Sequence, residues 1–168
     1  MAALPEAERE VLWRWIALTN REGEIDRLTR AQLRPVIDAT DDFAVANAGS
    51  FNTALPEPAK TDLTAGEKTL LLMYVVRRRD LMKPSLELSD EERQNIAQEA
   101  VAKNPDSGFT SLEFADLLAA VNATDDWAVD HAASFNSALP QPGRGVLKTP
   151  QKVRIFALVL EWRWRVGA

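Results

Sequence analysis

Two pairs of adjacent carboxylates are the residues of this 168-residue chain whose types first suggest chemistry, Asp41-Asp42 and Asp125-Asp126. Neighbouring carboxylates act as metal ligands or as a general acid and base when both side chains reach one point. Each pair follows a threonine that is typical of a helix start, and successive helical residues point about 100° apart. We therefore expect each pair in the first turn of a helix, where carboxylates stabilise the positive end of the helix dipole.

The composition of the chain and the spacing of its residues exclude the other common catalytic and metal-binding sites. Cysteine is absent and His131 is the single histidine, which excludes thiolate and multi-histidine metal sites. Asp130 and Ser134 are too close to His131 in the sequence to contact opposite imidazole nitrogens, as a catalytic triad requires. Residues 104–114 resemble a calcium loop but carry Ser107 where that loop requires glycine. The sequence predicts no enzyme, no cofactor and no metal site.

Arg77, Arg78 and Arg79 form a local cluster of basic residues with the charge to contact phosphate. The chain has a formal net charge of −5, and neither its first nor its second half is basic. This charge distribution argues against a nucleic-acid surface that depends on bulk positive charge. Cations also suit the C-terminal end of a helix, where we expect the cluster to lie. A nucleic-acid-binding or regulatory adaptor that uses these arginines is the alternative function.

Two Trp-Arg-Trp tripeptides contain four of the five tryptophans, at residues 13–15 and 162–164. Helical residues two apart are separated by about 200°, so both tryptophans of a tripeptide cannot face one narrow core. Tryptophan with neighbouring arginine is typical of the energetic centres of protein interfaces. The candidate interface residues are Trp162, Trp164, Arg163, Arg165 and Trp13. Intramolecular packing of the same side chains is the alternative.

The elements that must position these residues follow from an internal repeat. Residues 39–58 and 123–142 are identical at fourteen of twenty positions, and the match extends without a gap at a separation of 84 residues. This period is half of the chain, which predicts one duplicated unit in two copies, residues 1–84 and 85–168, packed as one body.

Helix-start signals divide each copy into four helices. Capping boxes begin at Thr29 and Thr64, and we expect the third helix to begin at Thr40 and to end before Pro56. The corresponding signals in the second copy are Ser89, Thr110, Thr124 and Thr149-Pro150. Because no sustained strand pattern occurs, the predicted fold class is all-α, with two tandem pseudo-symmetric four-helix units.

The retained segment also has a helical stripe that we expect to be buried, because its apolar residues recur at intervals of three and four. The stripe consists of Ala44, Ala48, Phe51 and Leu55, and it recurs as Ala128, Ala132, Phe135 and Leu139. Its retention in both copies therefore needs no active site.

The second half of each copy, residues 39–79 and 123–163, carries the pattern Ala-Ser-Phe-Asn-x-Ala-Leu-Pro-x-Pro, a short spacer, Gln-Lys and an apolar helix that ends in arginine. This pattern resembles small helical proteins encoded near the virion genes of tailed bacteriophages. The first copy has Glu67-Lys68 in place of Gln-Lys. The resemblance implies a non-enzymatic particle component, such as a head-to-tail connector (adaptor) or a capsid-decorating protein, and it supplies no site residues.

These observations together predict a structural or assembly protein that acts through protein–protein contacts. Its expected partners are copies of itself and neighbouring virion proteins, without membrane and without nucleic acid. The longest apolar runs are too short to cross a bilayer and the first residues do not form a signal peptide. We therefore expect a cytoplasmic protein on synthesis, and a virion location if the resemblance holds.

Overall fold

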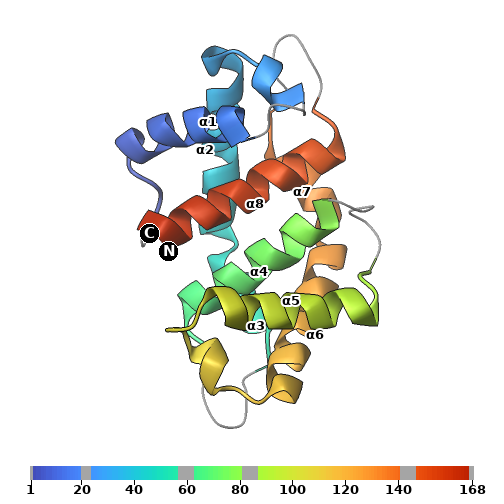
Figure 1. The fold of residues 1–168 in the computed structure, drawn as a ribbon. Coiled ribbons are helices and arrows are strands. Elements are labelled where there is room, and N and C mark those ends of the chain that lie inside the picture. Colours follow the sequence, from blue (N-terminus) through green and yellow to red (C-terminus); the bar gives the residue numbers. More distant parts are fainter. Residues whose placement is uncertain (1, 20–23, 57–62, 81–86, 141–146, 167–168) are drawn as a thin grey trace.

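The computed structural model describes residues 2–19, 24–56, 63–80, 87–140 and 147–166, and all regular structure in these ranges is helical (Figure 1). The all-α prediction is confirmed. The first half contains α1 (Glu6–Thr19), the 3₁₀ helix η1 (Glu24–Arg27), α2 (Arg30–Ala46), α3 (Ala48–Ala54) and α4 (Ala65–Asp80). The second half contains α5 (Asp90–Lys103), the 3₁₀ helix η2 (Gly108–Ser111), α6 (Phe114–Asp130), α7 (Ala132–Ala138) and α8 (Thr149–Val166).

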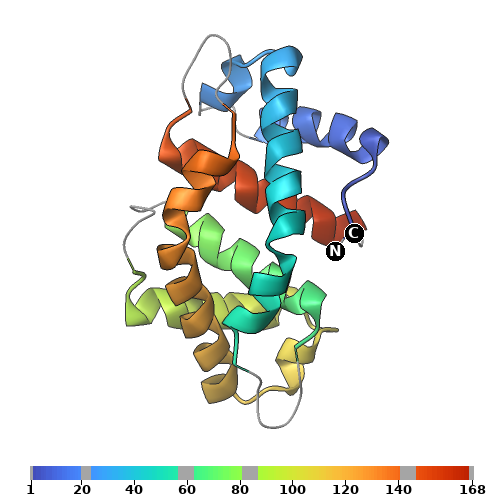
Figure 2. The same ribbon diagram turned by 180° about the vertical axis from the view of Figure 1, so that it is seen from behind.

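Helices α4 and α8 pack against each other at the centre of the molecule and run in opposite directions (Figures 1 and 2). Helix α8 also packs on α1 and α2, whereas α4 packs on α5 and α6. The last helix of each half therefore lies against the first two helices of the other half. The sequence repeat gave no indication of this exchange.

Apolar side chains form two clusters around these central helices. One cluster joins α4 to α5 and α6, and the other joins α8 to α1 and α2. Phe51 and Phe135 are both buried in the first cluster, as the stripe predicts, and each ring lies within reach of Phe156 of α8. Large-to-small changes at either ring would leave a cavity in a packed core.

Several predicted helix starts are confirmed by their capping bonds. At Thr29 the side chain accepts a hydrogen bond from the backbone of Gln32, whose own side chain accepts one from the Thr29 N–H. Thr64 and Glu67 make the same reciprocal pair at the start of α4. Ser89 accepts a hydrogen bond from the N–H of the third residue of α5. These bonds satisfy N–H groups that have no partner within the helix.

Three predicted helix starts are wrong. Thr40 and Thr124 lie inside α2 and α6, where each buried hydroxyl donates to the carbonyl four residues earlier. This bond lets threonine sit in a helix interior. The helices break instead at Asn47 and His131, which separate the long second helix of each half from its short third helix. Thr110 lies in η2, and α6 begins after Glu113.

Candidate protein-binding surfaces

The buried Asp125 is the centre of a charged cluster that joins three helices. Its carboxylate accepts hydrogen bonds from Arg79 of α4 at 2.8 Å, from Arg93 of α5 at 2.7 Å and from the backbone N–H of Leu88 at 3.0 Å. Asp125 and Arg79 are almost completely shielded from solvent. The carboxylate of Asp125 has all three of these donors, whereas Nη2 of Arg79 and Nε of Arg93 are buried without a hydrogen-bond partner among the described residues. Breaking this buried ion pair would leave a buried charge uncompensated, so the pair helps to fix how the three helices meet.

Asp41 makes the corresponding contacts in the other half of the molecule. Its carboxylate accepts hydrogen bonds from Arg163 of α8, from Arg9 of α1 at 2.7 Å and from the backbone N–H of Leu4 at 2.9 Å. Arg163 also donates to the carbonyl of Ala2, so the start of the chain is held against the end of α8. Each buried aspartate thus ties the last helix of one half to the second helix of the other.

These contacts correct the prediction for the paired carboxylates. Asp41 and Asp125 lie in the interior of α2 and α6 and are fully buried, so they are not in a first helical turn. Asp42 and Asp126 are exposed and contact Arg9 and Arg93. Within the described residues no group of three or more acidic or histidine side chains could hold a metal ion. The carboxylates have a structural role.

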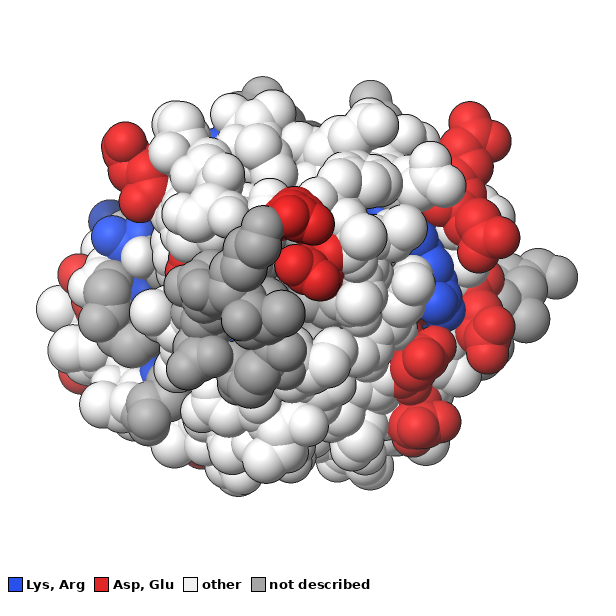
Figure 3. Space-filling view, turned by 90° about the horizontal axis from the view of Figure 1, so that it is seen from below, with Lys and Arg blue, Asp and Glu red and all other residues white. Residues whose placement is uncertain are grey.

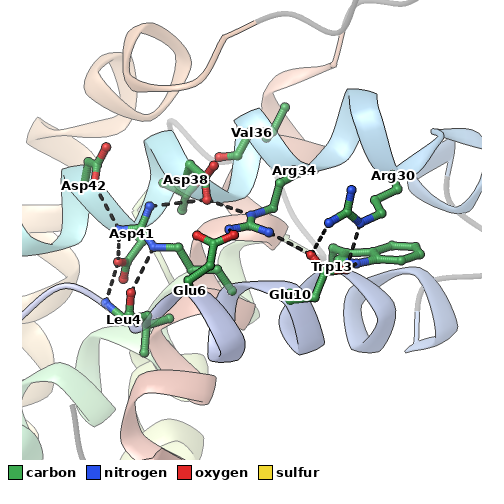
Figure 4. Close-up of polar contacts among 12 residues, drawn as sticks. Leu4, Glu6, Glu10, Trp13, Arg30, Arg34, Val36, Asp38, Asp41 and Asp42 are labelled. Atoms are coloured by element: carbon green, nitrogen blue, oxygen red, sulfur yellow. Dashed lines mark hydrogen bonds and ion pairs between the residues drawn. The ribbon is translucent and has the colours of Figure 1, made fainter.

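A second charged network lies on the surface between α1 and α2 (Figure 4). Glu10 accepts hydrogen bonds from Arg30 and from the indole of Trp13, and Arg34 reaches it at 2.9 Å. These donors lower the pKa of Glu10 to about 2, with the bond from Arg30 as the largest cause. Trp13 is therefore held within its own molecule, half-buried against the α1–α2–α8 cluster, with Arg14 over its ring.

The arginine cluster at the end of α4 is largely engaged by the protein itself. Arg79 is buried beside Asp125, so its side chain is not available to phosphate. Arg78 pairs with Glu92 of α5, and Arg77 lies 3.5 Å from Glu161 of α8. The face seen from below shows acidic side chains along the right edge, at the centre and at the upper left, and basic side chains only in small areas (Figure 3).

Helices α1 and α8 together present an apolar face, which we call the aromatic face: Val11, Trp15 and Leu18 of α1 with Trp162 and Val166 of α8. The α1 residues follow helical spacing, and Val11 and Leu18 are 46% and 61% exposed. The rings of Trp15 and Trp162 lie 5.4 Å apart between centroids. Arg165 lies over the Trp15 ring, and the Trp162 indole donates to Glu8 at 2.9 Å. The half-buried tryptophans form a rigid base for the exposed aliphatic side chains.

The described positions that match the aromatic face at the 84-residue separation lie on α5 and α4 and carry no large apolar residue. The positions of α5 that match Val11, Trp15 and Leu18 are Asn95, Glu99 and Ala102. Arg78, paired with Glu92, occupies the position that matches Trp162. Core packing alone does not require large apolar residues at these four positions, because the matching positions carry polar or small residues. The residue that matches Val166, Met82, lies outside the described residues.

The other tryptophan at the end of α8, Trp164, points to a different region. It lines a groove of about 640 Å³ together with the start of α4 and the segment after α5. The remaining lining residues are Thr64, Glu67 and residues 103–108. A Cβ on Gly66 would lie 2.9 Å from the Trp164 ring, so the indole rests directly on this glycine. Trp164 is 36% exposed.

The predicted interface residues therefore separate into three environments. Trp162 and Arg165 belong to the aromatic face, Trp164 lines the groove, and Trp13 lies in the α1–α2 network. Arg163 is fully buried against Asp41, so its assignment to a surface is wrong. The 200° separation of Trp162 and Trp164 directs them to different faces, as expected from helix geometry.

Sequence reasoning missed Val11, Leu18 and Glu67 as surface or groove residues. Leu18 and Val11 looked like ordinary members of an amphipathic helix, and Glu67 looked like a capping residue only. The buried ion pairs carried a usable signal: Arg79 and Asp125 recur as Arg163 and Asp41 at the 84-residue separation. Opposite charges retained within otherwise apolar segments of both copies indicate that they pair with each other.

His131 caps the end of α6. Its ring stacks on Trp127 at 4.0 Å between centroids, and its Nδ1 lies 2.8 Å from the carbonyl oxygen of Trp127. The helix break at this position explains these contacts, because the ring folds back over the last turn.

Comparison with protein-family models, with curated proteins and with solved structures finds no significant match to this chain. Within the described ranges, none of the helices combines the length and the apolar character that crossing a membrane requires.

Proposed function

We propose that this chain is a non-enzymatic assembly protein that binds other copies of itself through the aromatic face of α1 and α8. The observation that carries the proposal is the group of exposed aliphatic side chains, Val11 and Leu18, beside the packed pair Trp15 and Trp162. Large apolar residues gathered at one exposed position are typical of protein-binding surfaces.

Charge favours a head-to-tail contact between copies. Arg14 is exposed beside the aromatic face, and the exposed Arg165 pairs with Glu161 of its own helix at 3.2 Å. The first turn of α5 presents the exposed carboxylates of Asp90 and Glu91. An arginine-bordered face complements an acidic surface of the next copy, and head-to-tail contacts generate rings or filaments. The resemblance to phage proteins supports a setting for such an assembly, a virion in which the protein is a head-to-tail connector (adaptor) or a capsid-decorating protein.

The internal duplication belongs to the same proposal. We infer two units, residues 1–84 and 85–168, related by approximate twofold symmetry, with their last helices exchanged. The matching helix bounds and the matching Asp41 and Asp125 contacts support this arrangement. The boundary between the units lies outside the described residues. In this arrangement the residues that both units share form the stable core. The residues of α1 and α8 that differ from their matches on α5 and α4 form the binding face.

Sedimentation velocity over a range of protein concentrations tests the proposal. The double variant Val11→Ser, Leu18→Ser removes exposed apolar area without touching the two tryptophans. Its matched control is Asn95→Ser, Ala102→Ser at the corresponding positions of α5. We expect the unchanged protein and the control to assemble as concentration rises, and the Val11, Leu18 variant to stay monomeric. Equal assembly of both variants, or a monomer at every concentration, would overturn the proposal.

A further inference from the structure

The groove beside Trp164 contains a buried carboxylate that lacks a cationic partner. Glu67 is 6% exposed, and its carboxylate accepts hydrogen bonds from the backbone N–H groups of Thr64 and Gly108. No ion pair joins it to a cation among the described residues. Gly108 is required for this contact, because a Cβ there would lie 2.6 Å from Glu67 Oε2. Two neutral donors leave the negative charge of a buried carboxylate without a counter-charge.

The capping role of Glu67 does not require this charge. Gln151 occupies the matching position at the start of α8, and its side-chain oxygen accepts a hydrogen bond from the backbone N–H of Lys148 at 2.7 Å. A neutral amide therefore makes the equivalent capping bond in the other half. Capping therefore does not account for the negative charge of Glu67, which indicates a second role for this carboxylate.

The other groove residues add a second carboxylate and an aromatic ring beside Glu67. Asp106 is exposed and lines the groove, whereas the charge of Lys103 is already balanced by Glu99 at 2.7 Å. Trp164 adds a partly exposed indole ring. An indole face next to carboxylates suits a cation with a flat apolar surface, since such a cation stacks on the ring and bonds the carboxylate together.

We propose that this groove binds an arginine side chain from an extended segment of a partner protein. The guanidinium stacks on Trp164 and faces the carboxylates of Glu67 and Asp106. Guanidinium fits this arrangement better than ammonium because it is planar, weakly hydrated and able to donate two parallel hydrogen bonds. A groove of about 640 Å³ accommodates the side chain with its neighbouring residues. The proposal does not depend on the aromatic face.

A titration followed by NMR tests this site on the full chain. The probe is a capped peptide, Gly-Ala-Arg-Ala-Gly, and the reporters are the Gly108 amide and the Trp164 indole N–H. Matched peptides carry citrulline, which is neutral and of similar shape, or lysine. We expect the arginine peptide to shift both signals and to bind less tightly as salt rises, because exposed charges are screened.

Three variants separate binding from folding. Glu67→Gln keeps the capping bond from Thr64, as Gln151 shows, and loses the bond from the Gly108 N–H, because its amide has one acceptor oxygen. It should weaken arginine-peptide binding about tenfold or more because a charge-assisted bond is lost. Asp130→Asn changes the net charge equally at an exposed position on α6 and should leave affinity unchanged. Trp164→Ala should also weaken binding. No shift with the arginine peptide, equal binding of the citrulline or lysine peptide, or unchanged affinity in Glu67→Gln would each overturn the proposal. The aromatic-face proposal would be unaffected by any of these results.

Discussion

Removing the charge of Asp125 should destabilise the protein far more than removing the charge of its neighbour Asp126. Asp125 is fully buried and accepts three hydrogen bonds, from Arg79, Arg93 and the Leu88 N–H. In Asp125→Asn one oxygen remains as an acceptor. The new NH2 group faces either Arg79, if it replaces Oδ1, or Arg93 and the Leu88 N–H, if it replaces Oδ2. Arg79 then lies buried without a counter-charge.

The expected cost follows from this geometry. Breaking a buried ion pair by neutralising one partner costs about 3–5 kcal/mol. Asp126 is a suitable control because its side chain is 63% exposed and pairs with Arg93 at 3.0 Å. Exposed ion pairs contribute about 0–1 kcal/mol, so Asp126→Asn should change stability by no more than that. Natural domains are stable by about 5–15 kcal/mol, so the Asp125 effect should be large and easily measured.

Urea unfolding followed by tryptophan fluorescence and by circular dichroism measures the difference. The two probes should report one transition if α4 and α8 unite both halves into a single cooperative body. Replacing both Asp125 and Arg79 by leucine should recover only part of the loss. The buried Arg79 charge is removed, but Arg93 and the Leu88 N–H still lose their acceptor. Equal unfolding free energies for Asp125→Asn and Asp126→Asn would refute the assignment of Asp125 as a buried organiser of the helix exchange.

Further predictions concern the core, the pH dependence of stability and the groove. Phe51→Ala and Phe135→Ala should each lower the free energy of unfolding in denaturant by about 3–5 kcal/mol. Thr40→Ala loses only a hydrogen bond within its own helix and should lower it by about 1 kcal/mol. The reverse order would show that the rings are not in the core. Glu10 has a pKa lowered to about 2 in the folded protein, so its stabilising effect is present above its ordinary pKa near 4.5 and is lost as pH falls through about 2. The difference in melting temperature between the unchanged protein and Glu10→Gln should therefore disappear at the acidic end of a pH series, and a difference that grows on acidification would contradict the bond to Arg30. Gly66→Ala should displace the Trp164 ring, because the added Cβ would lie 2.9 Å from it; an unchanged NMR signal of the Trp164 indole would contradict that contact.

The sequence predicted the helical class, the packed phenylalanines and the helix starts at Thr29, Thr64 and Ser89, because these depend on local spacing and on bonds between near neighbours. Thr40 was misread because a threonine after an alanine fits both a helix start and a helix interior. The choice is made by burial, which brings Asp41 next to Thr40 into contact with Arg163, 122 residues away. A local sequence pattern cannot predict a contact between residues so far apart in the chain.

The candidate surfaces were predicted in part for the same reason. Helix geometry alone indicated that Trp162 and Trp164 face different directions, and the structure gives each its own surroundings. Arg163 was assigned to the surface because arginine between tryptophans is typical of interfaces, whereas its burial depends on the exchange of α8 onto α2. The groove combines α4, α8 and the segment after α5, which no sequence spacing brings together.

Side-chain oxidation by hydroxyl radicals, measured at low and at high protein concentration, tests the central claim most directly. The account predicts that Trp15, Leu18 and Trp162 become protected as copies assemble. Phe114, which is 46% exposed on α6, should be oxidised equally at both concentrations. Protection of Phe114 with unchanged oxidation of Leu18 and Trp162 would show that the molecule assembles through a different surface and would contradict the account.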